Sequence, residues 1–312
     1  MPSVAVIDIG SNSIKVLVAA RAADGGIASL ASRSIDARIS AGISKSNPRL
    51  TEEGMVRGLG AIRALLADAA PFVPVRTALV ATSAVRDAEN GPDFRARVRA
   101  ATGHEIRILS GDEEANLIGR GLTSDPALAT LRDFYVFDLG GGSLECLAFR
   151  DRQMRQAVSL QLGCVRLMEK FTADPAAPFS PQAGGQIAAH CRDLLKHGGF
   201  AFSLPADTVA VGTGGTMATV RAILGARVGK KLEQTDPFVT VAQLRELLGW
   251  LGAMPLTERR QIPGLPPARA DVFPTALATF LAVADAGFFT GFTNSLHNLR
   301  YGLAAEEIER LG

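Results

Sequence analysis

The sequence predicts a duplicated α/β protein, and two observations carry this fold class. A strand–turn–strand pattern, VAVIDIGSNSIKVLVA at Val4–Ala19, returns without gaps as FYVFDLGGGSLECLAF at Phe134–Phe149. Strand patterns also alternate with helical patterns along a chain of 312 residues, a length that suits two domains or one large α/β unit. Two copies separated by so long an interval predict duplicated domains facing each other across a cleft, because the period is too long for a solenoid.

The first copy opens a series of strands that is interrupted by helices. The predicted strands are Val4–Ile9, Ile14–Ala20, one within Ile27–Ile39, Thr77–Ala81 and Ile106–Leu109, with Gly10-Ser11-Asn12-Ser13 as the first turn. Thr51 is placed to cap a helix whose apolar stripe is Met55, Leu59, Ile62 and Leu66. Another helix is expected after Ser110.

The second copy repeats the pattern and continues into a more helical region. Predicted strands are Phe134–Leu139, Leu144–Phe149 and Asp207–Val211, with turns at Gly140-Gly141-Gly142-Ser143 and at Gly212-Thr213-Gly214-Gly215-Thr216. Predicted helices cover about 165–171, 181–197, 240–253 and 271–286, one follows Thr216, and a last one covers Leu299–Leu311. Pro-rich breaks at Asp174–Pro181 and Ile262–Pro267 are expected to be surface loops.

Composition excludes several classes of protein. Hydrophobic residues make up 47% of the chain and charged residues 21%, which is typical of a globular protein and not of a disordered one. A formal charge of +2 argues against a dedicated nucleic-acid binder. Asp8 interrupts the first apolar run and Asp285 the longest one, so neither a signal peptide nor a membrane span is expected. Three widely spaced cysteines predict neither disulfides nor zinc, and we expect a cytoplasmic protein.

Both copies of the turn have the chemistry of a phosphate-binding loop. A strand that ends in Asp and runs into Gly and Ser presents successive backbone N–H groups, and such a nest binds phosphate oxygens with help from the hydroxyls. The carboxylates of Asp8 and Asp138 would repel phosphate directly, so they are expected to hold Mg²⁺ or its bound water. The alternative is a pair of ordinary hairpins, which the match of Asp and Ser in both copies disfavours.

Glu114 is the candidate catalytic base. Ser110 and Glu113 fit a capping box, which gives Glu113 a structural role. Glu114 instead shares a helical face with Leu117, Ile118 and Gly121. A carboxylate on an apolar face points into the core or into a cleft, where burial favours a raised pKa and general-base chemistry. The alternative is a structural Glu that is paired with an Arg.

These motifs resemble the phosphate loops of the actin, hexokinase and Hsp70 superfamily. Within that superfamily the chain resembles the exopolyphosphatase and guanosine pentaphosphate phosphohydrolase family, in its short two-domain form. The supporting stretches, in the family's order between residues 7 and 274, are IDIGSNS, ATSAVRDAEN, ILSGDEEANLIG, FDLGGGSLE, SLQLGCVRL, VGTGGT and PPARADVFP. The resemblance implies two ribonuclease-H-like domains, at about 1–121 and 122–296, with the helix in 297–312 packing back on the first.

The resemblance also assigns roles to individual residues. Catalytic roles fall to Glu114, Arg86, Asp138 and Glu145, and metal contacts to Asp8, Asp138 and Glu145. Phosphate contacts fall to Gly10, Ser11, Asn12, Ser13, Lys15, Gly140, Gly141, Gly142, Ser143, Gly212, Gly214, Gly215, Thr216 and Arg269. The alternatives are an Arg86 that pairs with Asp87, a structural Glu145 and a surface Arg269. Arg166 and Arg300 are weaker candidates, since arginines are common on helix surfaces.

Several positions depart from the family's pattern, among them Ala276, which replaces a Gly in the helix after ARADV. Lys15 stands where the family usually has Arg, which keeps the charge but loses the bidentate fork. Ser40 and Ala41 replace a Gly and a Glu of an early motif, and Tyr301 replaces a Glu of a late one. The core chemistry is therefore expected to persist, while the grip on substrate or the closure of the domains is altered.

The expected reaction is hydrolysis of the terminal phosphoanhydride of inorganic polyphosphate, with Mg²⁺ or Mn²⁺ as cofactor. Removal of the 5′ γ-phosphate of guanosine pentaphosphate by the same residues is the nearest alternative, and the sequence does not separate the two. More distant alternatives are a kinase of the same superfamily and a non-catalytic polyphosphate or nucleotide sensor. No nucleic-acid or membrane partner is expected, and the family implies a homodimer.

Overall fold

The protein consists of two compact units. The structure is a computed structural model that describes residues 2–43 and 47–311. Unit 1 comprises Met1–Ala129 and His297–Gly312, and unit 2 comprises Thr130–Leu296. The boundary expected after residue 121 falls inside helix α4 (Gly111–Thr123), eight residues before the division that the structure shows. The C-terminal helix groups with unit 1.

Unit 1 is built on a five-stranded sheet with the order β3-β2-β1-β4-β5. The strands are β1 (Ser3–Ile9), β2 (Ile14–Arg21), β3 (Ile27–Ile35), β4 (Arg76–Ala81) and β5 (Ile106–Ile108). The central β1 pairs antiparallel with β2 and parallel with β4. All of its residues except Asp8 are buried, so both faces of the sheet are covered, as a strand with no polar alternation requires.

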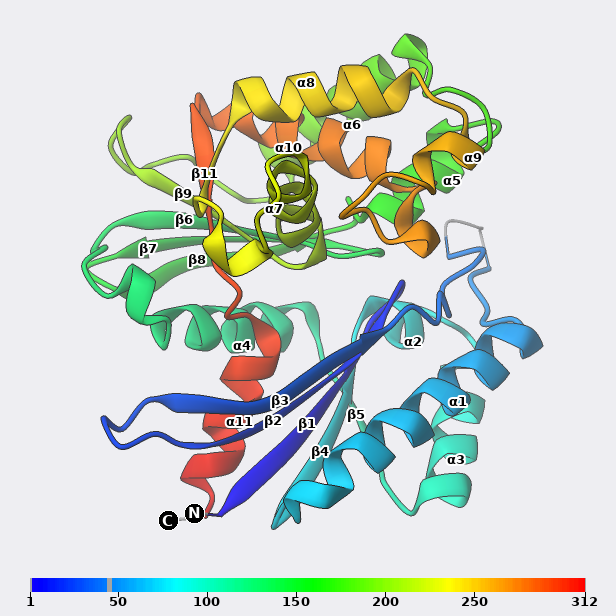
Figure 1. Ribbon diagram of the computed structural model, residues 1–312, viewed down its shortest axis with the longest axis vertical. Helices are drawn as coiled ribbons and strands as arrows, with labels where there is room; N and C mark the ends of the chain where they lie inside the picture. The colour runs from blue at the N-terminus through cyan, green and yellow to red at the C-terminus, as the bar shows by residue number, and fades with distance from the viewer. Residues whose placement is uncertain (1, 44–46, 312) are drawn as a thin grey trace. The chain divides into compact units, whose positions relative to one another are not determined.

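Helices cover the two faces of this sheet (Figure 1). They are α1 (Glu52–Ala69), α2 (Ser83–Arg86), α3 (Gly91–Thr102), α4 and α11 (Leu299–Glu309). Thr51 caps α1 as predicted, but the buried stripe of α1 includes Leu65, whereas Leu59 and Leu66 are only half-buried. Helices α4 and α11 pack at very close range, because a Cβ on Gly302 would lie 1.9 Å from the Leu117 carbonyl oxygen.

Unit 2 repeats the architecture with a six-stranded sheet of order β10-β11-β9-β6-β7-β8. Its strands are β6 (Phe134–Leu139), β7 (Leu144–Arg150), β8 (Gln153–Leu160), β9 (Val209–Thr213), β10 (Phe238–Thr240) and β11 (Gly291–Asn294). Strands β6, β7, β8, β9 and β11 correspond to β1, β2, β3, β4 and β5, and only β10 is extra. The registers also agree, since Asp8 faces Lys15 as Asp138 faces Glu145. The predicted class, two α/β domains of the ribonuclease-H-like kind, is confirmed.

The helical layer of unit 2 surrounds one apolar helix, α10 (Phe273–Gly287), which is buried from Phe273 to Ala284. Around it pack α5 (Cys164–Phe171), α6 (Pro181–His197), α7 (Gly215–Arg227) and α8 (Val241–Gly252), with the short α9 (Leu256–Arg259) nearby (Figure 1). Such a helix is hydrophobic all round because protein covers it on every side. Among the described residues no helix is long and apolar enough to span a membrane, and the three cysteines are buried and form no disulfide.

Most predicted elements are present, and the missed ones share a weak pattern. The sequence-based assignment left out β8, α3, the short helices α2 and α9, and the short strands β10 and β11. Strand β8, with the sequence QMRQAVSL, is an edge strand without a continuous apolar run, and α3 has only three buried residues.

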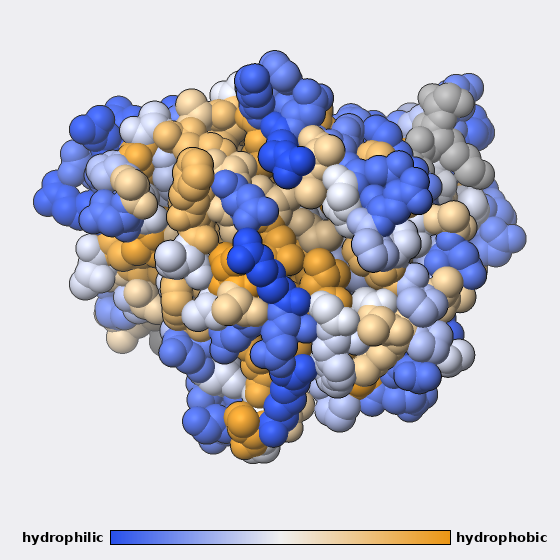
Figure 2. Space-filling model, turned by 90° about the horizontal axis from the view of Figure 1, so that it is seen from above, coloured by the Kyte–Doolittle hydropathy of each residue, from blue (hydrophilic) through white to orange (hydrophobic). Residues whose placement is uncertain are grey.

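On the face shown in Figure 2, apolar patches are interrupted by hydrophilic residues.

We predict that Gly302→Ala destabilises unit 1 by about 1–3 kcal/mol, because the new methyl group meets backbone of α4 and the two helices must separate. Gly60→Ala is the matched control, since Gly60 lies in α1 with open space around it and should gain up to about 1 kcal/mol. Urea denaturation of both variants measures this, and equal stability of Gly302→Ala and wild type would contradict the close packing.

Candidate active site

The carbonyl groups of the turn between β1 and β2 accept hydrogen bonds that fix the turn in place. The Gly10 N–H donates to the Ser13 carbonyl at 3.2 Å and closes the turn. The Asn12 carbonyl accepts from the Arg38 N–H at 2.8 Å, and the Ser11 carbonyl accepts from the Ser40 N–H at 3.3 Å. No acceptor for the N–H groups of Ser11, Asn12 and Ser13 exists among residues 2–43 and 47–311.

The turn between β6 and β7 is built in the same way, with a different supporting segment. The Gly140 N–H donates to the Ser143 carbonyl at 3.0 Å. The Gly140 carbonyl accepts from the Cys164 N–H at 3.0 Å, and the Gly141 carbonyl from the N–H of Val165 at 2.9 Å. The Arg166 guanidinium donates through Nε to the Gly142 carbonyl at 3.0 Å. Within the described part of the chain, the N–H groups of residues 141–143 have no acceptor.

Each turn therefore presents three successive N–H groups that have no acceptor in the part of the chain that the structure describes. Nearly all backbone donors in folded proteins are paired, so a run of three is a feature that requires an acceptor. Converging N–H groups in a turn are a binding site for phosphate oxygens. The predicted chemistry of both turns is thus compatible with their geometry.

The third glycine-rich element forms the N-terminus of α7. Gly214 has a φ of 84°, a conformation that favours glycine, and no side chain caps the helix. A Cβ on Gly215 would lie 2.1 Å from an Arg269 guanidinium nitrogen, so the arginine lies directly on the start of the helix. Within the described ranges, the Thr216 hydroxyl and the Arg269 Nε are buried without a hydrogen-bond partner. A helix N-terminus beside a guanidinium favours an anion.

A row of polar side chains crosses the sheet of unit 2 beside its turn. Asp138 faces Glu145 across β6 and β7, and Glu145 faces Ser159 across β7 and β8. Partners in a ladder lie on one face of a sheet, and the Ser159 hydroxyl donates to Glu145 Oε1 at 2.8 Å. Glu145 is 2% exposed. The corresponding row in unit 1 is Asp8, Lys15 and Ser34.

Asp138 and Glu145 fit a divalent cation better than Asp8 does. Mg²⁺ is commonly bound by one or two carboxylates together with substrate phosphates, and the Asp138–Glu145 pair supplies such a donor set. Asp138 Oδ1 would be 2.3 Å from a Cβ on Gly214, so this carboxylate lies against the third glycine-rich element. No group of three or more His, Cys, Asp or Glu side chains suited to a metal occurs in the described ranges.

Asp8 has a different electrostatic environment. Burial raises the pKa of the Asp8 carboxyl above its ordinary value, and the charges of Lys15 and Arg300 oppose this rise without cancelling it. Arg300 is anchored nearby through bonds to the Val16 carbonyl at 3.2 Å and the Ser32 hydroxyl at 2.9 Å. With two cations close to it, Asp8 is a poorer candidate for a metal ligand than the sequence suggested.

Glu114 is buried and held by Arg86. Burial extends to Leu117, Ile118 and Gly121, as the predicted apolar face requires. The Arg86 NH1 donates to Glu114 Oε2 at 3.1 Å and to the Leu109 carbonyl at 2.9 Å, and Nε donates to Asp87 at 3.3 Å. Both pairings that the sequence left as structural alternatives are therefore present. The capping box of Ser110 and Glu113 is also confirmed.

The two functional parts of unit 1 are linked through a short helix. The Ser83 hydroxyl lies 3.2 Å from the Ser11 hydroxyl of the turn. Ser83 begins α2, and Arg86 ends it. Helix α2 thus places the arginine that holds Glu114 at a fixed distance along the chain from a residue that touches the turn.

Several contacting residues were missed by sequence reasoning. Arg38 donates through Nε to Asn12 Oδ1 at 3.1 Å, and Ser83 and Ser159 make the contacts described above. Motifs that include Ser83 and Ser159 were recognised, but nothing in them indicated which side chain reaches the site. Arg166, ranked as a weak candidate, contacts the second turn.

Four of the departures from the family's pattern lie in unit 1, at Lys15, Ser40, Ala41 and Tyr301. Lys15 is the cross-strand neighbour of Asp8. Ser40 supports the first turn through its N–H, and its buried hydroxyl has no partner. Ala41 is half-buried in the turn that follows Ser40. Tyr301 stacks on His297 with ring centroids 3.7 Å apart.

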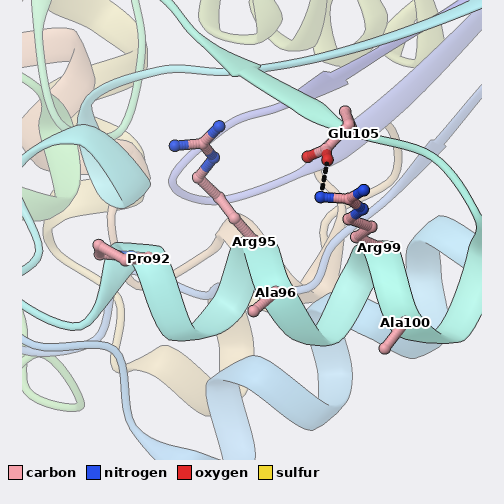
Figure 3. A pocket seen from close by; sticks show the side chains of 6 residues that line it. All are labelled: Pro92, Arg95, Ala96, Arg99, Ala100 and Glu105. Carbon is pink, nitrogen blue, oxygen red and sulfur yellow. Dashed lines mark ion pairs between the residues drawn. The ribbon is translucent and has the colours of Figure 1, made fainter.

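The largest of the described pockets contains none of the predicted site residues. Its volume is about 550 Å³, and Pro92, Arg95, Ala96, Arg99, Ala100 and Glu105 line it. Figure 3 shows Arg99 turned toward Glu105, with which it forms an ion pair of 2.8 Å. An open depression whose charged groups are partly paired with each other gives no sign of a catalytic centre.

The fold and the turns together define a class of protein, a duplicated α/β protein with a glycine- and serine-rich turn after the first strand of each unit. A model of the Ppx/GppA phosphatase family matches residues 17–310, and the chain belongs to that family. The matched stretch begins within β2, so it includes the second turn and Glu114, whereas the first turn precedes it.

Solved structures share the fold over nearly the whole chain. An exopolyphosphatase-like protein is 24% identical with a TM-score of 0.88, covering 99% of this chain and 100% of its own. An exopolyphosphatase from Cytophaga hutchinsonii is 22% identical with a TM-score of 0.85, covering 99% and 98%. The Ppx-GppA enzyme of Aquifex aeolicus is 24% identical with a TM-score of 0.75, covering 98% and 99%. Family and fold together support a phosphatase that acts as a hydrolase.

We predict that Gly163→Ala weakens the binding of inorganic tripolyphosphate at least about tenfold, because losing one charge-assisted hydrogen bond suffices for that change. A Cβ at this position would lie 2.3 Å from backbone atoms of Gly141 and Gly142 and would displace the turn. Gly185→Ala, in open space on α6, is the control. Calorimetric titration measures both, and unchanged affinity in Gly163→Ala would refute the role of the second turn.

We also predict that Asp8→Asn is more stable relative to wild type at neutral pH than at acidic pH. Because folding raises the pKa of Asp8, the native state binds the extra proton, and the free energy of unfolding of the wild type falls as pH rises through that range. Asn does not titrate and lacks this loss. Denaturation curves over a pH series test this. The free energy of unfolding of Asp8→Asn minus that of wild type should increase as pH rises, and a difference that stays constant or decreases would contradict the prediction.

Proposed function

We propose that this protein is an exopolyphosphatase that hydrolyses the terminal phosphoanhydride of inorganic polyphosphate and releases orthophosphate, with Mg²⁺ or Mn²⁺ as cofactor. Water attacks the terminal phosphorus, the bond to the bridging oxygen breaks, and the chain leaves one phosphate shorter. The observation that carries this proposal is a turn in each unit with three successive N–H groups that have no acceptor among residues 2–43 and 47–311. A repeating polyanion is the substrate for which such paired sites are suited.

Glu114 is assigned the role of orienting or deprotonating the attacking water. Its burial and its bond from Arg86 hold the carboxylate in one position, which is what a general base requires. Arg86 uses NH1 and Nε on protein acceptors, and in the described ranges NH2 has none. That nitrogen is therefore assigned to an oxygen of the transferred phosphoryl group.

The remaining residues bind and neutralise phosphate. The N–H groups of the two turns and the serine hydroxyls of Ser13 and Ser143 are assigned to phosphate oxygens, and Lys15 to their charge. Gly212–Thr216 and Arg269 form a further anion site at the start of α7. Asp138 and Glu145 would hold the divalent cation, which when bound supplies positive charge to the phosphoryl oxygens. Catalysis by positioning and electrostatics is general for phosphoryl transfer.

We predict that Glu114→Gln lowers the rate of orthophosphate release from long-chain polyphosphate by about 10²–10⁴-fold, the contribution of a positioned general base. The amide still accepts the bond from Arg86, so the fold is retained. Glu113→Gln is the control on the neighbouring residue, because Gln also completes a capping box. Wild-type turnover by Glu114→Gln, with the metal present, would contradict the assignment of Glu114 as the general base.

The substrate is tested by measuring kcat/KM for polyphosphate and for guanosine pentaphosphate side by side. A higher value for polyphosphate supports the proposal, and a higher value for guanosine pentaphosphate replaces it with the alternative of the same chemistry. Tight binding of either compound without release of phosphate would indicate a sensor. Transfer of phosphate from ATP to an added acceptor would indicate a kinase.

A further inference from the structure

We propose that Ser159 is a positioning residue that orients Glu145 for the divalent cation. This inference rests on the proposed function, because it concerns the cation that Asp138 and Glu145 would hold. It arises from a contact between two strands that no motif indicates. Ser159 is the residue of β8 directly opposite Glu145 of β7.

The geometry leaves little freedom for the Glu145 carboxylate. The Ser159 hydroxyl donates to Oε1 at 2.8 Å, an ordinary length for an O–H···O hydrogen bond. A glutamate has three side-chain torsions, and a bond to one oxygen restricts the orientations that its carboxylate can adopt. Glu145 is almost entirely buried, so water does not provide this bond in place of Ser159.

The row Asp138, Glu145 and Ser159 places this bond beside the second turn. Asp138 precedes the turn, Glu145 follows it, and Ser159 begins the segment that supports it. That segment continues through Gly163, which packs directly on Gly141 and Gly142, to Arg166. The same short stretch therefore positions both the turn carbonyls and a carboxylate of the metal pair.

Unit 1 supplies the comparison that makes this specific. Ser34 occupies the equivalent place on β3, opposite Lys15. Lys15 has no acceptor oxygen, so a serine hydroxyl cannot orient it by donation. Ser34 is exposed, whereas Ser159 is bonded to a buried carboxylate. A positioning role follows for Ser159 and not for Ser34.

The test measures direct binding of Mn²⁺ to the full chain without substrate. Electron paramagnetic resonance monitors the concentration of the free ion. Ser159→Ala should weaken Mn²⁺ binding about 10–100-fold, the usual effect of removing a hydrogen bond to a metal ligand. Ser159→Thr should restore binding, because it keeps the hydroxyl on a strand, and Ser34→Ala should bind like wild type. Glu145→Gln should lose the site.

Each outcome decides the inference. Equal Mn²⁺ affinity in Ser159→Ala and wild type would overturn it, and so would failure of Ser159→Thr to restore the affinity or wild-type binding by Glu145→Gln. Absence of any Mn²⁺ binding by wild type would also overturn it. The proposed function fails separately, if wild type releases no phosphate from polyphosphate. Circular dichroism of Ser159→Ala shows whether that variant is folded. If Ser159→Ala does not fold, Ser159→Cys replaces it, because Cys has a similar size and only a weak donor, and it should bind Mn²⁺ more weakly than wild type.

Discussion

The candidate site depends on one constraint, the hydrogen bonds that later segments of the chain donate to the carbonyl groups of the two turns. In each unit, a later segment of the chain donates N–H groups to the carbonyls of the glycine- and serine-rich turn. A peptide group whose carbonyl is fixed has its N–H fixed as well, since the two point in opposite directions across a rigid plane. The first turn therefore keeps the N–H groups of Asn12 and Ser13 in place, and the second turn keeps those of residues 141–143. None of these groups has an acceptor within the described residues, so an incoming anion finds them already arranged.

The duplication explains why the two units contribute different charges to similar positions. The strand registers are the same, and both copies place Asp before the turn. Across the ladder, however, unit 1 has Lys15 and unit 2 has Glu145. A carboxylate beside an ammonium group is largely neutralised, whereas two neighbouring carboxylates attract a cation. One backbone design thus places an aspartate–lysine pair beside the turn of unit 1 and an aspartate–glutamate pair beside the turn of unit 2, through a single difference in residue type.

The parts of the site that could be predicted from the sequence are those coded by local patterns. Glycines and serines after a strand predict the turns, and the helical spacing of Glu114 with Leu117 and Ile118 predicts its burial. Contacts between distant segments could not be predicted in this way. Ser83 reaches Ser11 over 72 positions and Arg38 reaches Asn12 over 26, and neither belongs to a periodic pattern. Strand β8 was missed because an edge strand need not alternate, and the partner of Glu145 was missed with it.

The Arg86–Glu114 pair shows why a buried ion pair need not compete with catalysis. Removing two charges from water costs more than their attraction returns unless further hydrogen bonds satisfy them. Arg86 obtains these hydrogen bonds from the Leu109 carbonyl and from Asp87, so the position of the guanidinium does not depend on the glutamate alone. The energy that fixes the pair is therefore supplied by groups that take no part in the reaction. The carboxylate stays oriented, which is a property that a base for an attacking water needs.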